Sequence, residues 1–168
     1  MVQPAGSSSL TVEPARPDDF ARIAELTVDV YVRGGLASPN YASELADVRG
    51  RAGQADLLVV RDPSGRVVGS VALVLHGEFG NVITSDEEAA FRMLVVDPAA
   101  QGQGVGRLLV TSCLERASAI GKRRMVISTD PRMTTAHRLY EGLGFTRLPE
   151  RDWRPEPGIE LLVYCRDL

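Results

Sequence analysis

The sequence has few of the features that mark secreted or membrane-spanning proteins. It contains only two cysteines, Cys113 and Cys165, and neither has another cysteine or a histidine at a spacing typical of a metal site. We therefore expect two buried thiols in a reducing, cytoplasmic environment. The longest apolar runs, such as 57–60 and 71–75, are far shorter than the roughly 20 residues that span a bilayer. Residues 1–9 lack the basic and apolar segments of a signal peptide, and we expect a flexible tail.

Positive charge is not concentrated anywhere in the chain. Lysine and arginine total 19, against 22 aspartates and glutamates, so the formal net charge is −3. Proteins that bind DNA or RNA present a dense basic surface, and nucleic acid is therefore not an expected partner. A hydrophobic content of 44% in 168 residues is enough to bury a core. Residues 10–168 are predicted to form one domain.

The spacing of apolar residues predicts a mixed sheet with helices on both faces. Strands are expected at 10–16, 55–61, 66–76, 90–96, 124–129, 145–148 and 159–165, and helices at 20–31, 41–51, 105–120 and 134–143. The turn Asp62-Pro-Ser-Gly65 favours a hairpin between the second and third strands. The order strand, helix, strand over 90–129 predicts a parallel βαβ unit. Segments 77–85 and 149–158 are expected to be loops.

A glycine-rich turn, Gln101-Gly-Gln-Gly-Val-Gly106, separates the buried strand 90–96 from the helix 105–120. Free backbone N–H groups at such a turn, together with the helix dipole, form a cradle for phosphate. The turn is not a P-loop, because Arg107 and Leu108 stand where that motif has lysine and a hydroxyl residue. It is not a dinucleotide-binding fingerprint either, because its spacing is GxGxG and it comes after residue 100. A tight turn without a ligand is the alternative, although three glycines lose much backbone entropy.

Two stretches together resemble the GNAT superfamily of N-acetyltransferases. Phe91-Arg-Met-Leu-Val-Val-Asp-Pro98, followed by the glycine-rich turn, is similar to motif A of that family, [QR]-x-x-G-x-[GA]. Ala136-His-Arg-Leu-Tyr-Glu-Gly-Leu-Gly-Phe145 is similar to motif B, A-x-x-L-Y-x-x-x-G-F. The resemblance covers residues 10–167. It implies an α/β fold with a mostly antiparallel sheet around a central parallel βαβ unit, and transfer of an acetyl group from acetyl-CoA to a primary amine.

The resemblance also implies a binding site for acetyl-CoA and no metal. The backbone of Leu94, Val95 and Val96 would pair with the pantetheine arm, and an N–H of Val95 or Val96 would polarise the thioester carbonyl. The pyrophosphate would lie on the amides of the turn, flanked by two longer side chains. These turn and flanking residues are Gln101, Gly102, Gln103, Gly104, Val105, Gly106 and Arg107. The alternative for Arg107 is a solvated side chain in the first helical turn.

Tyr140 matches the tyrosine of motif B, which the family places beside the departing sulfur. A thiol has a pKa near 8.5 and a tyrosine near 10, so full proton transfer to the thiolate is slightly uphill. We therefore expect Tyr140 to act as a catalytic residue that protonates the sulfur or donates a hydrogen bond to it. The alternative is an aromatic side chain that only packs beside Leu139 and Leu143.

The general base is where the chain departs from the family pattern. Many members carry a glutamate two residues before the position of Arg92, and Ala90 stands there in this sequence. Glu88 has the same strand parity and lies roughly 6–7 Å further along the strand, a gap that a water molecule spans. We therefore predict Glu88 as a water-relayed catalytic base. The alternatives are a solvated loop carboxylate and an enzyme without a dedicated base.

The acceptor is chosen in this family by two segments that correspond to 32–40 and 149–158. Neither has a strong net charge, which argues against a polycationic acceptor and leaves small amines, amino acids and protein amines open. Trp153 either lines the acceptor cleft or packs under the second segment. Two other functions also stay open, a non-catalytic acyl-CoA-binding module that lost its base, and an acyltransferase for longer acyl chains. The family often forms homodimers, so a dimer is a further expectation.

Overall fold

The computed structural model describes residues 10–77 and 82–168, and these residues form a single sheet with five α-helices. The predicted tail 1–9 and part of the predicted loop 77–85 lie outside the described residues. The strands are β1 Val12–Pro14, β2 Asp56–Arg61, β3 Val67–Val74, β4 Glu88–Val96, β5 Arg124–Thr129, β6 Thr146–Arg147, β7 Trp153–Glu156 and β8 Ile159–Asp167. The helices are α1 Phe20–Val28, α2 Ala42–Ala46, α3 Val48–Ala52, α4 Val105–Ala119 and α5 Thr134–Gly142. Short 3-10 turns occupy Pro17–Asp19, Pro39–Tyr41, Pro98–Ala100 and Pro149–Arg151, and a π-helical turn occupies Asp29–Arg33.

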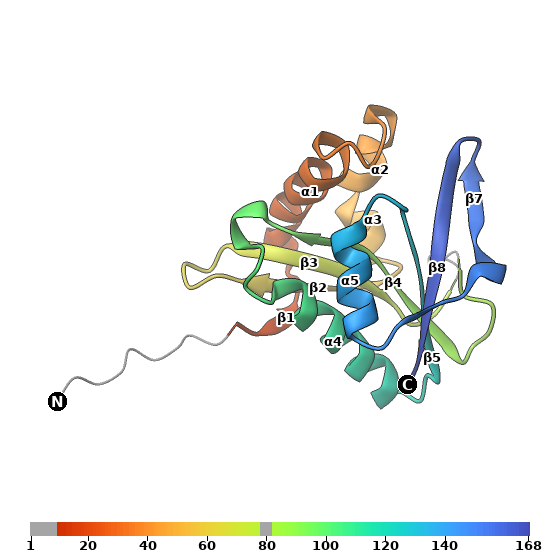
Figure 1. Ribbon diagram of the computed structural model, residues 1–168. Helices are drawn as coiled ribbons and strands as arrows, with labels where there is room; N and C mark the ends of the chain where they lie inside the picture. Colours follow the sequence, from red (N-terminus) through yellow and green to blue (C-terminus); the bar gives the residue numbers. More distant parts are fainter. Residues whose placement is uncertain (1–9, 78–81) are drawn as a thin grey trace.

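The strands follow the order β1-β2-β3-β4-β5-β8-β6, with β7 paired to β8 (Figure 1). Strands β4 and β5 are parallel and every other recorded pair is antiparallel. This is the mixed, mostly antiparallel fold predicted from the sequence. Within the described ranges, no helix is both long and apolar enough to cross a membrane.

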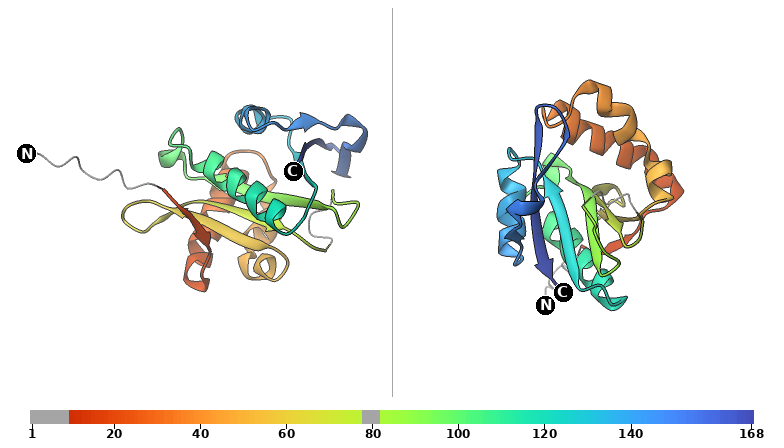
Figure 2. Two further views of the ribbon diagram at one scale, coloured as in Figure 1. Left: turned by 90° about the horizontal axis from the view of Figure 1, so that it is seen from below. Right: turned by 90° about the vertical axis from the view of Figure 1, so that its right-hand side faces the viewer.

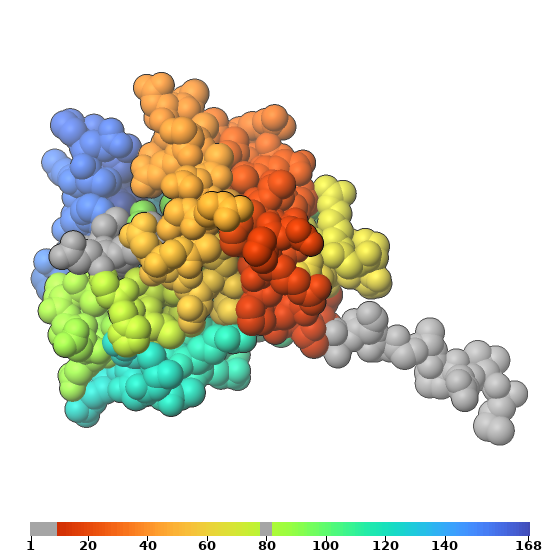
Figure 3. All heavy atoms as spheres, turned by 180° about the vertical axis from the view of Figure 1, so that it is seen from behind, coloured from red at the N-terminus to blue at the C-terminus, as the bar shows by residue number. Residues whose placement is uncertain are grey.

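Helices cover both faces of the sheet, as the alternation of apolar residues along β2 requires. Leu58 and Val60 join the core under α4 and α5, whereas Leu57 and Val59 join the core under α1 and α3. Figure 2 shows α1 to α3 and α5 on opposite sides of the strands. In Figure 3, seen from behind, α1 to α3 cover the upper part of the face, and α4 lies below them. Each fully buried leucine or valine contributes about 1.5–3 kcal/mol to folding, so both faces stabilise the sheet.

Three predicted elements differ from the structure. The helix expected at 41–51 is split into α2 and α3 at Asp47, whose ψ of 67° is not helical and whose carboxylate caps the N–H of Gly50 at 3.0 Å. The helix expected at 20–31 is α-helical only to Val28 and then widens into the π-helical turn. The loop expected at 149–158 contains β7.

Strands β4 and β5 are paired at one end and apart at the other. Their recorded pairs are Glu88 with Arg124 and Ala89 with Met125. Beyond Ala89, β4 stays bonded only to β3, and a bulge interrupts that ladder because Ser70 pairs with Val95 and Ala72 with Arg92. Residues 93 and 94 therefore both lie opposite residue 71. Met93 adopts a φ of 53°, in the left-handed region that side chains other than glycine rarely adopt.

Candidate active site

A cavity of about 450 Å³ opens where β4 and β5 separate. Its walls come from residues 91–94 of β4, residues 128–130 at the end of β5, and Tyr140 of α5. The segment 36–38 and residues of the β7–β8 hairpin close it further. A cavity of this size suits a small molecule. Both segments that the sequence predicted to choose an acceptor thus contribute to its lining.

Tyr140 is packed and faces the cavity at the same time. Its ring lies 5.8 Å from those of Phe91 and Phe145, centroid to centroid, and its side chain is only 4% exposed. The hydroxyl makes no hydrogen bond to another described residue. Burial raises the pKa of Tyr140 well above its ordinary value, which makes proton transfer from the hydroxyl harder and favours donation of a hydrogen bond. The structure therefore holds a free O–H donor in the cavity wall.

The glycine-rich turn needs glycine for two different reasons. Gly102 and Gly104 have φ values of 81° and 80°, and a Cβ there would meet no other atom within 4 Å, so the backbone conformation is the constraint. Gly106 needs space instead, because a Cβ would lie 3.2 Å from Leu139 Cδ2 and 3.8 Å from Val96 Cγ2. The first turn of α4 is thereby held against β4 and α5.

The N-terminus of α4 is open to a ligand. Gly104 is its N-cap residue and no side chain caps the first N–H groups. Arg107, in the first turn of α4, packs against the next helix, since a Cβ on Gly142 of α5 would be 3.6 Å from its Nη2. The structure thus brings together most of the predicted cofactor-binding residues, namely the end of β4, the turn and the start of α4.

The direction of the backbone amides distinguishes Val95 from Val96. Asp97 donates its N–H to Val68 O at 2.8 Å, and N–H groups alternate in direction along an antiparallel strand. The N–H of Val95 therefore points to β3 and its partner Ser70, whereas the N–H of Val96 points away from β3. Of the two amides left open by the sequence, that of Val96 is the one available to a ligand.

Glu88 lies outside the cavity. Its side chain is 7% exposed, and both carboxylate oxygens accept hydrogen bonds from Arg151, at 2.8 and 3.0 Å. Thr84 donates its backbone N–H to the same carboxylate at 2.9 Å. Desolvation raises the pKa of Glu88, but these hydrogen bonds outweigh it and the net pKa is lowered. A carboxylate committed to an ion pair is a weak base, which argues against the predicted role of Glu88 as the catalytic base. The alternative of a solvated loop carboxylate is wrong, because the residue is buried.

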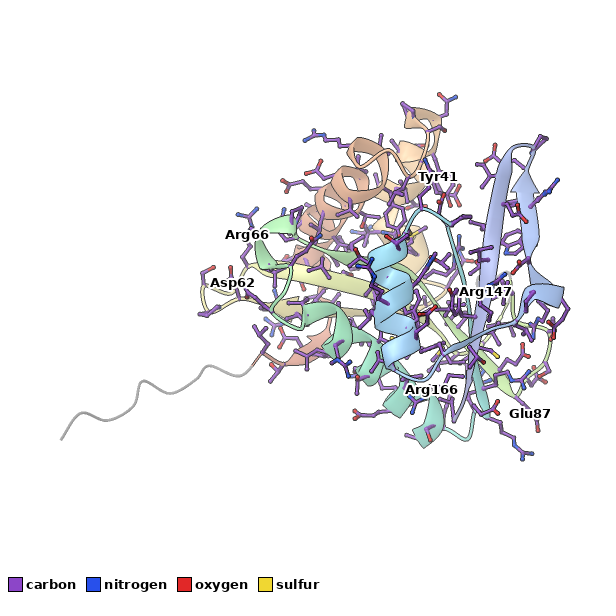
Figure 4. The ribbon with its side chains drawn as sticks, viewed as in Figure 1. Tyr41, Asp62, Arg66, Glu87, Arg147 and Arg166 are labelled. Carbon is purple, nitrogen blue, oxygen red and sulfur yellow. The ribbon has the colours of Figure 1, made fainter. Side chains whose placement is uncertain are left out.

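The acceptor side of the cavity contains residues that sequence reasoning missed. Tyr31, from the π-helical turn, donates to Leu94 O at 3.4 Å, and burial raises its pKa to about 12. Tyr41, labelled in Figure 4, precedes α2 and lines the cavity. Burial raises its pKa, and the charge of Arg92 partly offsets this effect. Glu44 of α2 also lines this side. Only Arg92 had a signal in the sequence, because it shares the strand parity of Ala90.

Trp153 satisfies both alternatives, since it lines the cavity and packs against the core cluster around Ala90 and Val126. Its indole N–H is buried and has no hydrogen-bond partner among the described residues. Across the cavity mouth, Arg132 bonds Asp130 and also the carbonyl oxygens of Gly35 and Leu36, at 2.8 and 3.3 Å. In the part of the chain that is described, no three His, Cys, Asp or Glu side chains are grouped closely enough to hold a metal ion.

Comparisons with known proteins agree with this geometry. The model of the acetyltransferase (GNAT) family matches residues 20–145. Glucosamine 6-phosphate N-acetyltransferase of Trypanosoma brucei brucei is 30% identical over 115 residues, which cover 67% of this chain and 72% of that protein.

Solved structures share the fold over nearly the whole chain. A GNAT acetyltransferase of Staphylococcus aureus Mu50 superposes with a TM-score of 0.76 at 12% identity, covering 95% of this chain and 99% of that one. An acetyltransferase of Salmonella typhimurium, solved with its cofactor acetyl-CoA, superposes with a TM-score of 0.68 at 23% identity, covering 96% and 95%. With a family match over well more than half of its length, the chain belongs to the GNAT family of acetyltransferases.

Proposed function

We propose that this GNAT N-acetyltransferase transfers the acetyl group of acetyl-CoA directly to a primary amine inside the cavity between β4 and β5. One observation carries the proposal: a single cavity is lined by Phe91 and Tyr140 from the α4–α5 side of the sheet and by Tyr31, Tyr41 and Arg92 from the α1–α3 side. A cofactor on the first side and an acceptor on the second would therefore meet where the strands part.

The glycine-rich turn fits a pyrophosphate. The amides of residues 102–106 and the uncapped start of α4 offer N–H donors and the positive end of a helix dipole. The cation of Arg107 lies in the first turn of α4, and the backbone of residues 94–96 would pair with the pantetheine arm.

Acetyl-CoA supplies an activated acetyl group as a thioester. The N–H of Val96 is placed to stabilise the negative charge that develops on the carbonyl oxygen, a contribution of a few kcal/mol in related chemistry. The Tyr140 hydroxyl, kept protonated by burial, donates to the departing sulfur. Since Glu88 is held by Arg151, the amine proton passes to water or to the cavity carboxylates, among them Glu44 and Glu156.

The first test compares Tyr140→Phe with a matched control, Tyr164→Phe. Tyr164 belongs to the same aromatic group, 6.3 Å from Tyr140 between ring centroids, but its hydroxyl bonds Glu141 and does not line the cavity. We expect Tyr140→Phe to lower kcat about 100-fold, with unchanged binding of acetyl-CoA, and Tyr164→Phe to retain activity. Equal activity of wild type and Tyr140→Phe would remove Tyr140 from the mechanism.

The cofactor itself is tested by thermal unfolding with acetyl-CoA, free CoA and a longer acyl-CoA. A ligand at 100 times its Kd adds about 2.7 kcal/mol to stability, which raises the Tm of a domain of this size by roughly 5–10 °C. Stabilisation by acetyl-CoA supports the proposal. If none of the three compounds raises the Tm, the glycine-rich turn does not hold this cofactor and the proposal fails.

A further inference from the structure

Arg92 brings a positive charge to the acceptor side of the cavity. It lies on β4 between Phe91, which packs toward α4 and α5, and the bulge residue Met93. Its pairing with Ala72 places its side chain on the opposite face, because Ala72 packs with Ile23 under α1. Arg92 is half-buried and lines the cavity. A guanidinium therefore faces the space where the acceptor would sit.

Arg92 has aromatic and charged neighbours on this side of the sheet. Tyr41 and Tyr31 line the same cavity, and the charge of Arg92 partly offsets the rise that burial causes in the pKa of each. Behind them lies Arg51, which is 4% exposed and bonds the carbonyl oxygens of Glu44 and Leu45 at 3.3 and 3.0 Å. Burial and then the nearby charge of Arg92 lower the pKa of Arg51. A second guanidinium group therefore lies close to Arg92, although Arg51 itself does not line the cavity.

Carboxylates elsewhere in the lining limit how much negative charge a ligand brings. Glu44, Asp130 and Glu156 all line the cavity, and Asp130 is already paired with Arg132 at 2.8 Å. A dianion such as a phosphate monoester would be repelled by Glu44 and Glu156. A zwitterion suits this arrangement better, because its anionic group meets Arg92 while its ammonium group meets the acidic rim.

We infer that the acceptor is an amine that carries its own carboxylate, as an α-amino acid does, and that Arg92 binds this carboxylate. The inference rests on the proposed function and names the acceptor class for it. The planar fork of arginine matches the two oxygens of a carboxylate. Arg92 is also the neighbour of the bulge in β4, so a molecule held by its carboxylate there presents its amine close to the proposed site of transfer.

The experiment compares acceptors that differ only in the carboxylate. Release of CoA from acetyl-CoA is measured with the twenty common α-amino acids, with their carboxamides and with their decarboxylated amines. We expect at least one amino acid to be acetylated with kcat/KM about 10–100 times that of its amide and amine, the range for a hydrogen bond to a charged group.

Variants then assign the preference to Arg92. We expect Arg92→Gln to lower kcat/KM for the amino acid to the level of its amide while leaving the amide unchanged, and Arg92→Lys to fall between the two. The control is Arg49→Gln, because Arg49 lies on α3 against the Phe20 ring, at 5.9 Å, and outside the cavity lining. It should keep the full preference.

The outcomes separate this inference from the proposed function. Acetyl-CoA should raise the Tm of Arg92→Gln as much as that of wild type, which shows that the variant is folded and its cofactor site intact. Equal rates with acids and amides, or a preference that survives Arg92→Gln, overturn the inference and leave the proposed function standing. Acetyl-CoA binding without transfer to any amino acid also overturns it. Absence of acetyl-CoA binding by wild type refutes the proposed function, and the inference with it.

Discussion

The two ends of strand β4 use charged residues in opposite ways. Glu88 and Arg92 lie four residues apart on the same face of this strand. At the Glu88 end β5 is paired with β4, and Arg151 and Thr84 neutralise and bond the buried carboxylate. At the Arg92 end β5 has moved away and the side chain faces a cavity of about 450 Å³. The first charge stabilises the fold, and the second lines the cavity.

This difference shows what strand parity does and does not determine. Alternation along a strand decides which face a side chain takes, and Glu88, Ala90 and Arg92 do share a face. It does not decide whether the neighbouring strand is present there. Because β4 and β5 separate after Ala89, Glu88 lies in the packed part of this face, whereas Arg92 lies in the part that borders the cavity. The following predictions test this difference between a structural and a functional position.

Removing the partner of Glu88 should have the largest effect on stability. Arg151→Ala leaves a buried carboxylate without its cation and also removes a bond to Val82 O. We expect the free energy of unfolding to fall by about 3 kcal/mol, which lowers the Tm by roughly 6–12 °C. Urea unfolding measures it. Arg124→Ala is the control, because its pair with Asp167 is exposed and should contribute less than about 1 kcal/mol. Equal losses in both variants would contradict a structural role for the buried pair.

Glu88→Gln removes the negative charge but keeps the shape of the side chain, at the end of β4 where β5 is paired with it. The native pKa of Glu88 is lowered relative to the unfolded value of about 4.3, so the ionised carboxylate stabilises the fold above that pH and loses this effect as the pH falls through the native pKa. Wild type should therefore exceed Glu88→Gln by about 1–2 kcal/mol at pH 7, and the difference should disappear as the pH falls through the native pKa. Unfolding at stepped pH values measures this. A tenfold loss of kcat in the folded variant would instead place Glu88 in the chemistry.

Two glycines at opposite ends of α4 distinguish an effect on acetyl-CoA binding from an effect of backbone strain alone. Gly104 precedes the helix at a φ of 80° and Gly121 follows it at 86°, and a Cβ on either meets nothing within 4 Å. Each change to alanine should cost about 1 kcal/mol of stability. Only Gly104→Ala should also weaken acetyl-CoA binding, about five- to tenfold, the equivalent of one backbone hydrogen bond. Calorimetric titration distinguishes them, and an equal loss of affinity in both would remove the turn from the cofactor site.

Much of the fold was predictable because its signals are local. The turn at 62–65, the apolar run of β4 and the glycines that bound α4 each act through neighbouring residues. The split at Asp47 was missed although its signal is local, since the carboxylate caps the N–H of Gly50 three residues further on. Strand β7 was missed for a different reason. Its polar, proline-containing sequence is a strand only because it pairs with β8.

The candidate site also has a part that was predictable from local sequence and a part that was not. Motif spacing predicted the glycine-rich turn, Val95 or Val96, and Tyr140 as parts of one site, and this assignment stays a prediction. The acceptor side depends on contacts between distant segments, such as Tyr41 with Arg92, which no local pattern records. Glu88 was misplaced because its partner Arg151 is 63 residues away in the chain. Parity alone could not reveal that ion pair.

The smallest expected effect on stability concerns Trp153, which lies between the core around Ala90 and the cavity. Its buried N–H has no partner among the described residues, which costs about 1–3 kcal/mol, and Trp153→Phe removes it together with some packing area. We expect stability to stay within about 0.5 kcal/mol of wild type or to rise. Tyr164→Phe, which removes a hydroxyl bonded to Glu141 at 3.4 Å, should instead lose about 0.5–1 kcal/mol. Thermal unfolding of both measures the difference in sign, and a loss above 1 kcal/mol in Trp153→Phe would mean that the indole N–H does have a partner in the native protein.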